Sequence, residues 1–126
     1  MNRVAIVTGG TRGIGAEISR QLKAAGRTVV ASYAANDAAA QDFSRETGIH
    51  VEKFDAGDFA QCAAAVQKIT KDHGPITIVV NNAGITRDAT LTKMTRDMWD
   101  SVIDTNLGSC FNLCKLTFEG MRTEKF

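Results

Sequence analysis

A glycine-rich segment near the start of the chain is the first place where residue types and spacing suggest chemistry. It reads VTGGTRGIG over residues 7–15, with one arginine among four glycines. Glycine adopts positive φ and lets a bulky partner approach the backbone closely. A strand-to-helix turn made of such residues offers free N–H groups and the positive end of a helix dipole to an anion such as a pyrophosphate. The alternative is a close helix–strand contact without a ligand.

The elements that must position this turn alternate along the chain. Runs of β-branched residues predict strands over residues 4–7, 28–32, 51–55 and 76–80, the last of them a central strand. Apolar residues at helical spacing predict two helices with stripes at Ile14, Ile18, Leu22, Ala25 and at Phe59, Ala63, Val66, Ile69. Between them a helix begins after Asn36 and ends at Gly48, and Thr95 caps a later helix.

A last helix, predicted over residues 107–121, has more than one apolar side. One side carries apolar residues at positions 107, 110, 111, 114, 118 and 121, and Leu113 and Leu116 lie on a second side. Strands that alternate with helices over short connections predict an α/β fold with a Rossmann-type parallel sheet covered on both faces. The expected strand order is 3-2-1-4, within one domain that takes in residues 1–126.

In such a sheet, ligands bind beyond the carboxyl ends of the strands. The glycine turn follows the first strand, Asp55 and Ala56 end the third, and the segment NNAG at residues 81–84 follows the fourth. These three segments should therefore meet at one ligand site.

Composition excludes several classes of function. Of the 126 residues, 44% are hydrophobic and 23% charged, and the net charge is +1, as in an ordinary globular domain. The chain has no long basic block, which argues against nucleic acid as a partner. It has no apolar stretch of about 20 residues and no secretion signal, which argues against a membrane and favours the cytoplasm. Cys62, Cys110, Cys114, His50 and His73 lack metal-ligand spacing, so no metal is expected.

Four motifs in order resemble the short-chain dehydrogenase/reductase family: TGGTRGIG, FDAGD, NNAG and DTNL. The resemblance covers the whole chain and implies cofactor contacts for a set of residues at the three segments above. Gly9, Thr11, Gly13, Ile14 and Gly15 would lie around the pyrophosphate, Asp55 and Ala56 at the adenine, and Asn82, Ala83 and Gly84 near the ribose. The chemistry agrees, because Asp55 can accept from an exocyclic amine and small residues admit a sugar. A helix cap for Asp55 and an Asx-turn for Asn82 are the alternatives.

The charges near the second strand bear on which nicotinamide cofactor would bind. An NAD site usually carries a carboxylate at the end of that strand, whereas an NADP site carries an arginine. Ser32 and Tyr33 occupy that place, and no acid follows until Asp37. Arg12 stands where NADPH-using members of the family often have a basic residue, and arginine binds phosphate through two N–H groups. We therefore expect NADPH; the alternative is that Arg12 only covers the turn and faces water.

The segment from Gly84 to Leu107, GITRDATLTKMTRDMWDSVIDTNL, is similar to bacterial members of the family that reduce 3-oxoacyl thioesters. The resemblance implies hydride transfer from NADPH to the 3-keto carbon, with acetoacetyl-CoA, a substrate of polyhydroxyalkanoate synthesis, favoured over acyl carrier-protein thioesters. Thr86 and Asp88 would line the substrate loop, and solvated loop positions are the alternative.

One departure from the family concerns its catalytic group. The family donates a proton from a Tyr in a Tyr-x-x-x-Lys motif and polarises the carbonyl with a Ser. Here the only tyrosine is Tyr33, followed four residues later by Asp37. Of the catalytic group only Asn106 is present, where the resemblance implies that it holds a water in the proton relay. The alternative is an asparagine that interrupts a helix and bonds neighbouring backbone.

The missing Tyr, Lys and Ser predict that the chain is the N-terminal half of a longer reductase and is inactive by itself. The resemblance implies a homo-oligomer, a tetramer in the whole protein, built partly on the last helix. A fourth strand with one unpaired edge would also favour self-association. The alternative is a noncatalytic dinucleotide-binding or assembly module that lacks the Tyr and Lys.

Overall fold

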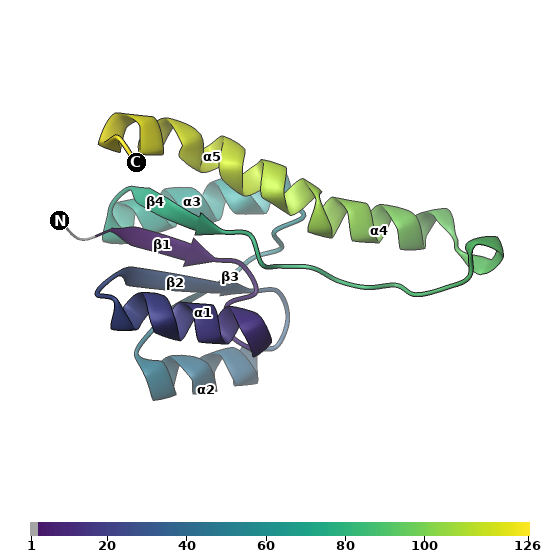
Figure 1. The fold of residues 1–126 in the computed structure, drawn as a ribbon, viewed down its shortest axis with the longest axis horizontal. Coiled ribbons are helices and arrows are strands. Elements are labelled where there is room, and N and C mark those ends of the chain that lie inside the picture. Colours follow the sequence, from purple (N-terminus) through teal and green to yellow (C-terminus); the bar gives the residue numbers. More distant parts are fainter. Residues whose placement is uncertain (1–2) are drawn as a thin grey trace.

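A computed structural model describes residues 3–126, which form a four-stranded parallel sheet with helices on both faces (Figure 1). The strands are β1 (Val4–Val7), β2 (Thr28–Tyr33), β3 (His50–Lys53) and β4 (Ile76–Val80). Their spatial order is β3-β2-β1-β4, and every neighbouring pair runs parallel. The predicted Rossmann-type sheet and its order are confirmed.

The helices begin and end close to the positions that their capping residues predict. They are α1 (Gly13–Ala24), α2 (Asp37–Thr47), α3 (Phe59–His73), the 3-10 turn η1 (Leu91–Lys93), α4 (Arg96–Asn106) and α5 (Gly108–Glu124). Asn36 caps α2 by accepting from the Ala39 N–H at 3.0 Å, and Gly48 ends that helix with φ +73°. Thr95 caps α4 in the same way. Local chemistry thus sets most of these boundaries.

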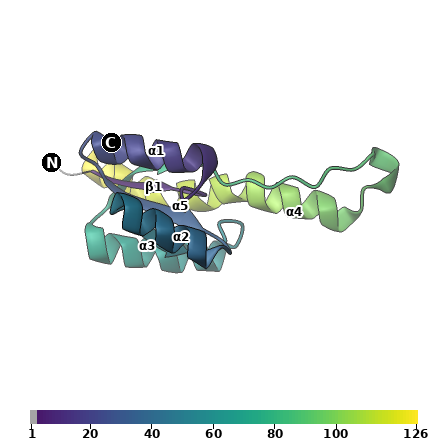
Figure 2. The same ribbon diagram turned by 90° about the horizontal axis from the view of Figure 1, so that it is seen from below.

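Two hydrophobic clusters lie on opposite faces of the sheet because successive strand side chains point to opposite sides. Val7, Val29 and Ala31 pack with residues of α1 and α2, whereas Val4, Ile6 and Val30 pack with residues of α3 and α5. Figure 2 shows β1 between α1 and α3. The sheet therefore lies between two helical layers. Because its strands are parallel, their carboxyl ends all lie at the same edge.

The buried faces of α1 and α3 differ from the predicted stripes. In α1 the buried residues are Gly15, Ala16 and Ser19, while Ile14 is 77% exposed. The Ser19 hydroxyl donates to the carbonyls of Gly10 and Gly15, at 3.0 and 2.9 Å, so its burial leaves no polar group unpaired. In α3 the buried face is likewise made of Cys62, Ala65 and Ile69, and Phe59 is exposed. The predicted stripes are therefore confirmed in part: Ile69 is buried, and Ile18, Leu22 and Val66 pack against the core.

The last helix packs into the core through the second of its two apolar sides. α5 buries Ser109, Asn112, Leu113 and Thr117. The predicted main stripe faces outward, with Leu107, Phe111 and Phe118 between 58% and 66% exposed. Leu113, from the second predicted side, is the residue that packs into the core. Burial leaves neither polar side chain unpaired, because Asn112 donates to the Ala56 carbonyl and Thr117 to the Leu113 carbonyl of its own helix.

The β-rich run of β4 predicts a central strand, and the expected order 3-2-1-4 leaves one of its edges unpaired. Within the described chain β4 is an edge strand that pairs only with β1. Beyond it, the loop, η1 and α4 project away from the layered body in both views (Figures 1 and 2). Within residues 3–126 no helix is both long and apolar enough to cross a membrane.

Candidate functional site

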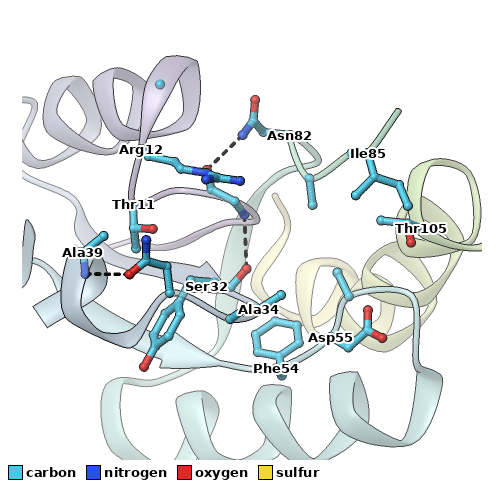
Figure 3. A pocket seen from close by; sticks show the side chains of 18 residues that line it. Thr11, Arg12, Ser32, Ala34, Ala39, Phe54, Asp55, Asn82, Ile85 and Thr105 are labelled. Atoms are coloured by element: carbon cyan, nitrogen blue, oxygen red, sulfur yellow. Dashed lines mark hydrogen bonds between the residues drawn. The ribbon is translucent and has the colours of Figure 1, made fainter. Parts of the chain in front are cut away.

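A cavity of about 460 Å³ opens at the carboxyl ends of the strands. Its wall includes most of the residues expected to bind a cofactor: Gly9, Thr11, Arg12, Gly13, Asp55, Ala56, Asn82, Ala83 and Gly84. Figure 3 shows labelled side chains from these three segments around one open space. Ile14 and Gly15 do not line it, because Ile14 faces outward on α1 and Gly15 is buried beneath the turn.

The glycines of the turn are required for two different reasons. Gly9 and Gly13 have φ of +61° and +57°, a region that L side chains rarely adopt. Gly15 leaves no room for a side chain, because a Cβ there would lie 2.1 Å from the Gly9 carbonyl oxygen. A Cβ on Gly10 would lie 2.7 Å from the Val7 carbonyl oxygen. Gly10 and Gly15 thus serve packing inside the turn, whereas Gly9 and Gly13 line the cavity and present backbone without a Cβ there, as an anion cradle requires.

Thr8, which sequence reasoning did not single out, ties the glycine turn to the segment after β4. Its buried Oγ1 accepts from the Asn82 and Ala83 N–H groups, at 3.0 and 2.9 Å, and donates to the Val80 carbonyl. In return, the Asn82 side-chain amide donates to the carbonyls of Thr8 and Gly9, both at 3.1 Å. Asn82 therefore bonds the glycine turn across the sheet edge. The signal of Thr8 in the sequence is its place as the first residue of the motif TGGTRGIG, which by itself assigns it no role.

The end of β2 supports the same turn. The Ser32 Oγ accepts from the Gly9 N–H at 3.3 Å, and its carbonyl accepts from the Gly10 N–H at 3.0 Å. Several further residues that sequence reasoning did not assign to the site also line the cavity: Ala34, Ala35, Asn36, Ala39, Phe54, Ile85 and Thr105. Apolar and small side chains of this kind carry no sequence signal of their own.

Near the end of β2, the one acidic side chain is already paired. Asp37 does not line the cavity; it accepts from the Tyr33 hydroxyl at 3.1 Å and from Lys53 at 3.3 Å. The Tyr33 hydrogen bond and then Lys53 lower the pKa of Asp37, while partial burial and then Asp37 raise the pKa of Tyr33. Arg12 lines the cavity, and no ion pair within residues 3–126 involves it. The cavity therefore has a free cation and no free carboxylate on this side.

Asp55 and Ala56 form the opposite wall. One Asp55 oxygen accepts from the Gly57 N–H at 2.9 Å, and the Asp55 N–H donates to Gln61 at 2.9 Å. The helix cap is instead Asp58, which accepts from the Gln61 N–H at 3.1 Å. The alternative role of Asp55 as the cap of α3 is therefore wrong.

Asn106 lies at the end of α4, and its side chain is used to hold the segment after β4. Its Oδ1 accepts from the Ile85 N–H at 2.7 Å, and its Nδ2 donates to the Ile85 carbonyl at 3.0 Å. The alternative that it bonds neighbouring backbone is wrong, because Ile85 stands 21 residues earlier. Ile85 itself lines the cavity, so Asn106 shapes the wall without being part of it.

Thr86 and Asp88 are exposed and lie outside the cavity. In the part of the chain that the structure describes, no three His, Cys, Asp or Glu side chains gather as metal ligands, and all three cysteines are free.

Comparison with known proteins identifies the family to which the chain belongs. The short chain dehydrogenase family model matches residues 3–126. The chain belongs to the short chain dehydrogenase family. Reductases of this family bind a nicotinamide dinucleotide, and the cavity lies where the fold holds one.

Several curated relatives in this short chain dehydrogenase family match the whole chain. It is 54% identical over 126 residues to an acetoacetyl-CoA reductase of Shinella zoogloeoides and 52% identical over 126 residues to one of Paracoccus denitrificans. Each match covers 100% of this chain and 52% of the relative. A 3-oxoacyl-acyl-carrier-protein reductase of Chlamydia muridarum is 44% identical, over 96% of this chain and 51% of the relative. The chain thus spans about half the length of the curated relatives it matches.

Proposed function

We propose that this chain is the dinucleotide-binding half of an NADPH-dependent reductase that converts a 3-oxoacyl thioester, with acetoacetyl-CoA favoured, to the 3-hydroxyacyl thioester. The observation that carries the proposal is the cavity at the strand ends, where the glycine turn, the Asp55 wall and the NNAG segment meet. Relatives named as reductases of such thioesters support the choice of substrate class. When bound, the cofactor supplies the hydride.

The residues present fit a dinucleotide. Gly9 and Gly13 line the cavity with backbone that carries no Cβ, and Gly10 and Gly15 let the turn pack closely on its inner side. The N-terminus of α1 adds the positive end of its dipole. Thr11, Gly13 and Ile14 stand in the same turn and α1 start. Asp55 and Ala56 would bind the adenine, while Asn82, Ala83 and Gly84 would border the ribose.

NADPH is preferred to NADH in this proposal because of the charges near β2. Arg12 has no ion pair within the described chain, whereas Asp37 is held by Lys53 and Tyr33. A free guanidinium beside the cavity favours a 2′-phosphate, which a free carboxylate would repel.

The proton transfer needs groups that these 126 residues do not contain, since the only tyrosine is Tyr33. Asn106 contributes by fixing Ile85 and the loop that leads to Thr86 and Asp88, where the substrate would pass. We infer that the Tyr, Lys and Ser of the family belong to a further part of the protein. The same absence favours one alternative, a noncatalytic dinucleotide-binding or assembly module.

Two measurements test the proposal, and the second separates a reductase from a noncatalytic dinucleotide-binding module. Fluorescence titration of the 126-residue chain should show NADPH binding that is at least about tenfold tighter than NADH binding, because an arginine–phosphate pair contributes about 1.5–3 kcal/mol. Arg12→Ala should remove most of that preference. The chain alone should not oxidise NADPH with acetoacetyl-CoA, whereas the intact protein that carries it should. Absence of turnover by the intact protein would favour the noncatalytic module.

We further propose that the protein assembles through the outer side of α5. Phe111, Cys114 and Phe118 form an apolar surface there, beside Lys115 and Glu119. Exposed apolar patches rimmed by charges are typical of interfaces between proteins. A second copy of the protein is the partner expected for this surface.

A further inference from the structure

A buried asparagine of α5 holds the wall of the cavity from beneath. Asn112 is 6% exposed, and its Nδ2 donates to the Ala56 carbonyl at 3.0 Å. The Cys62 thiol donates to the same carbonyl at 3.3 Å. Since a thiol is a weak donor, Asn112 supplies the stronger of these two bonds.

The Ala56–Gly57 peptide unit connects Asn112 to the Asp55 carboxylate. The carbonyl of this unit accepts from Asn112, and its N–H, on Gly57, donates to the Asp55 Oδ1 at 2.9 Å. A peptide unit is planar, so fixing its oxygen also fixes the direction of its N–H. Hydrogen bonds in such a series strengthen one another by polarisation. The orientation of the Asp55 side chain, in the segment between β3 and α3, therefore depends on a residue of α5.

Glycine at position 57 lets this unit lie close to the end of α4. A Cβ there would lie 3.2 Å from the Asp104 carbonyl oxygen and 3.4 Å from the Thr105 Cα. The wall segment is thus held by α4 on one side and by α5 beneath, while Asp55 faces the cavity. With its Oδ1 engaged by Gly57, Asp55 keeps its second oxygen for a ligand.

We propose that Asn112 is a positioning residue for base recognition: it orients the Ala56–Gly57 peptide unit and, through it, the Asp55 carboxylate that selects adenine by its exocyclic amine. This inference rests on the proposed binding of a dinucleotide. It adds a residue outside the cavity that determines which base the cavity accepts.

The test compares NADPH with reduced nicotinamide hypoxanthine dinucleotide phosphate, in which a carbonyl oxygen replaces the 6-amine and the adjacent N1 carries a proton. Hypoxanthine has a carbonyl oxygen where adenine has the amine, so a correctly oriented carboxylate should disfavour it by at least about tenfold. We expect the original chain to show this ratio of dissociation constants in a fluorescence titration. Asn112→Leu should reduce the ratio to within about threefold of unity, because the carboxylate loses its fixed direction.

Thr117→Val is the matched control. Thr117 is buried on the same face of α5, but its hydroxyl donates only to the Leu113 carbonyl of its own helix. It should leave the ratio unchanged, whatever it does to stability. Asn112→Ser is a second, smaller change in case Asn112→Leu does not fold. The serine hydroxyl is too short to reach the Ala56 carbonyl in place of the amide. Asn112→Ser should also reduce the ratio.

The outcomes are distinct. Equal weakening of both cofactors by Asn112→Leu or Asn112→Ser, with the ratio kept, would overturn the inference and leave Asn112 a packing residue. A ratio near unity in the original chain, with NADPH still bound, would overturn it too, but not the proposed function. If the original chain binds neither cofactor, the proposed function fails and the inference with it.

Discussion

At the scale of single residues, the glycines of the turn meet two different requirements, a positive φ at one position and lack of space for a side chain at another. Gly13 has φ +57°, and a Cβ there would meet no atom within 4 Å. Gly15 has no positive φ, but a Cβ there would lie 2.1 Å from the Gly9 oxygen and 2.5 Å from the Asn82 amide nitrogen. Gly13 therefore serves backbone conformation, and Gly15 serves close approach.

Alanine substitutions should distinguish these two roles. Gly13→Ala should cost about 1–2 kcal/mol of unfolding free energy, the usual cost of a left-handed L residue. Gly15→Ala should cost about 3 kcal/mol or more, because rigid backbone would have to move. Urea unfolding of both variants checks the order, and a larger loss in Gly13→Ala would contradict it.

Thr8 gives a second prediction at this scale. Thr8→Val keeps the shape of the side chain but leaves the Ala83 N–H without its acceptor, whereas the Asn82 N–H retains a bond to the Val80 carbonyl. We expect a loss of about 3 kcal/mol in unfolding free energy, since an unpaired buried N–H and a lost hydrogen bond add up. Thr8→Ser keeps the hydroxyl and should cost about 1 kcal/mol for the methyl group. Equal losses in the two variants would show that the hydroxyl is not what matters.

At the scale of elements, α3 carries a thiol whose burial has a pH-dependent consequence. Burial, and then the charge of Asp55, raise the pKa of Cys62 from 9.0 to about 11. The folded protein thus keeps the proton in a range where the unfolded chain loses it. The stability that the protonated Cys62 thiol contributes is fully present below pH 9 and is lost as the pH rises from 9 to about 11.

Cys62→Ala should remove this term. We expect the unfolding free energy of the original chain to fall more steeply between pH 9 and 11 than that of the variant, by about 2 kcal/mol over the interval. Urea unfolding at both pH values measures the two slopes, and the change shared by other titrating groups cancels in the comparison. Parallel slopes would mean that the buried thiol does not resist ionisation.

The elements also show where sequence patterns are reliable. Asn36, Gly48 and Thr95 marked helix ends correctly, because capping depends on a few adjacent residues. The core-facing sides of α1 and α3 were predicted only in part: Ile18, Leu22 and Ile69 pack in or against the core, but Ile14 and Phe59 are exposed. The burial of a helix face depends on partners elsewhere in the chain. Ser19 and Asn112 are buried with their hydrogen bonds satisfied, a fact that hydrophobicity along one helix does not contain.

At the scale of the whole molecule, two surfaces are suited to bind a partner. The edge of β4 is unpaired by any strand of the described chain, and the outer side of α5 exposes Phe111 and Phe118, at 61% and 58%. Open strand edges and clustered aromatic side chains both favour association. α5 therefore has a core function on one side and an assembly function, by our proposal, on the other.

Phe118→Glu should weaken self-association at least about tenfold, because burying a central aromatic residue contributes about 2 kcal/mol or more to an interface. The matched control is Phe59→Glu, which changes an aromatic residue of α3 that is 44% exposed and lies on another element. Sedimentation velocity over a range of concentrations should show a shift toward monomer for the first variant only. The same shift in both variants, or in neither, would argue against α5 as the interface.

The sequence by itself determined the order of strands and helices, most of their caps, the sheet topology and half of the residues that line the cavity. These depend on local propensities, on the handedness of parallel connections and on short motifs that lie at strand ends. Only the tertiary structure decided that Thr8 joins two motifs, that Asp55 is not a cap, that Asn106 holds Ile85 and that Asn112 lies under the cavity wall. Each of these rests on a hydrogen bond that the fold creates between elements, and a polar side chain does not reveal in sequence which distant backbone group it will meet.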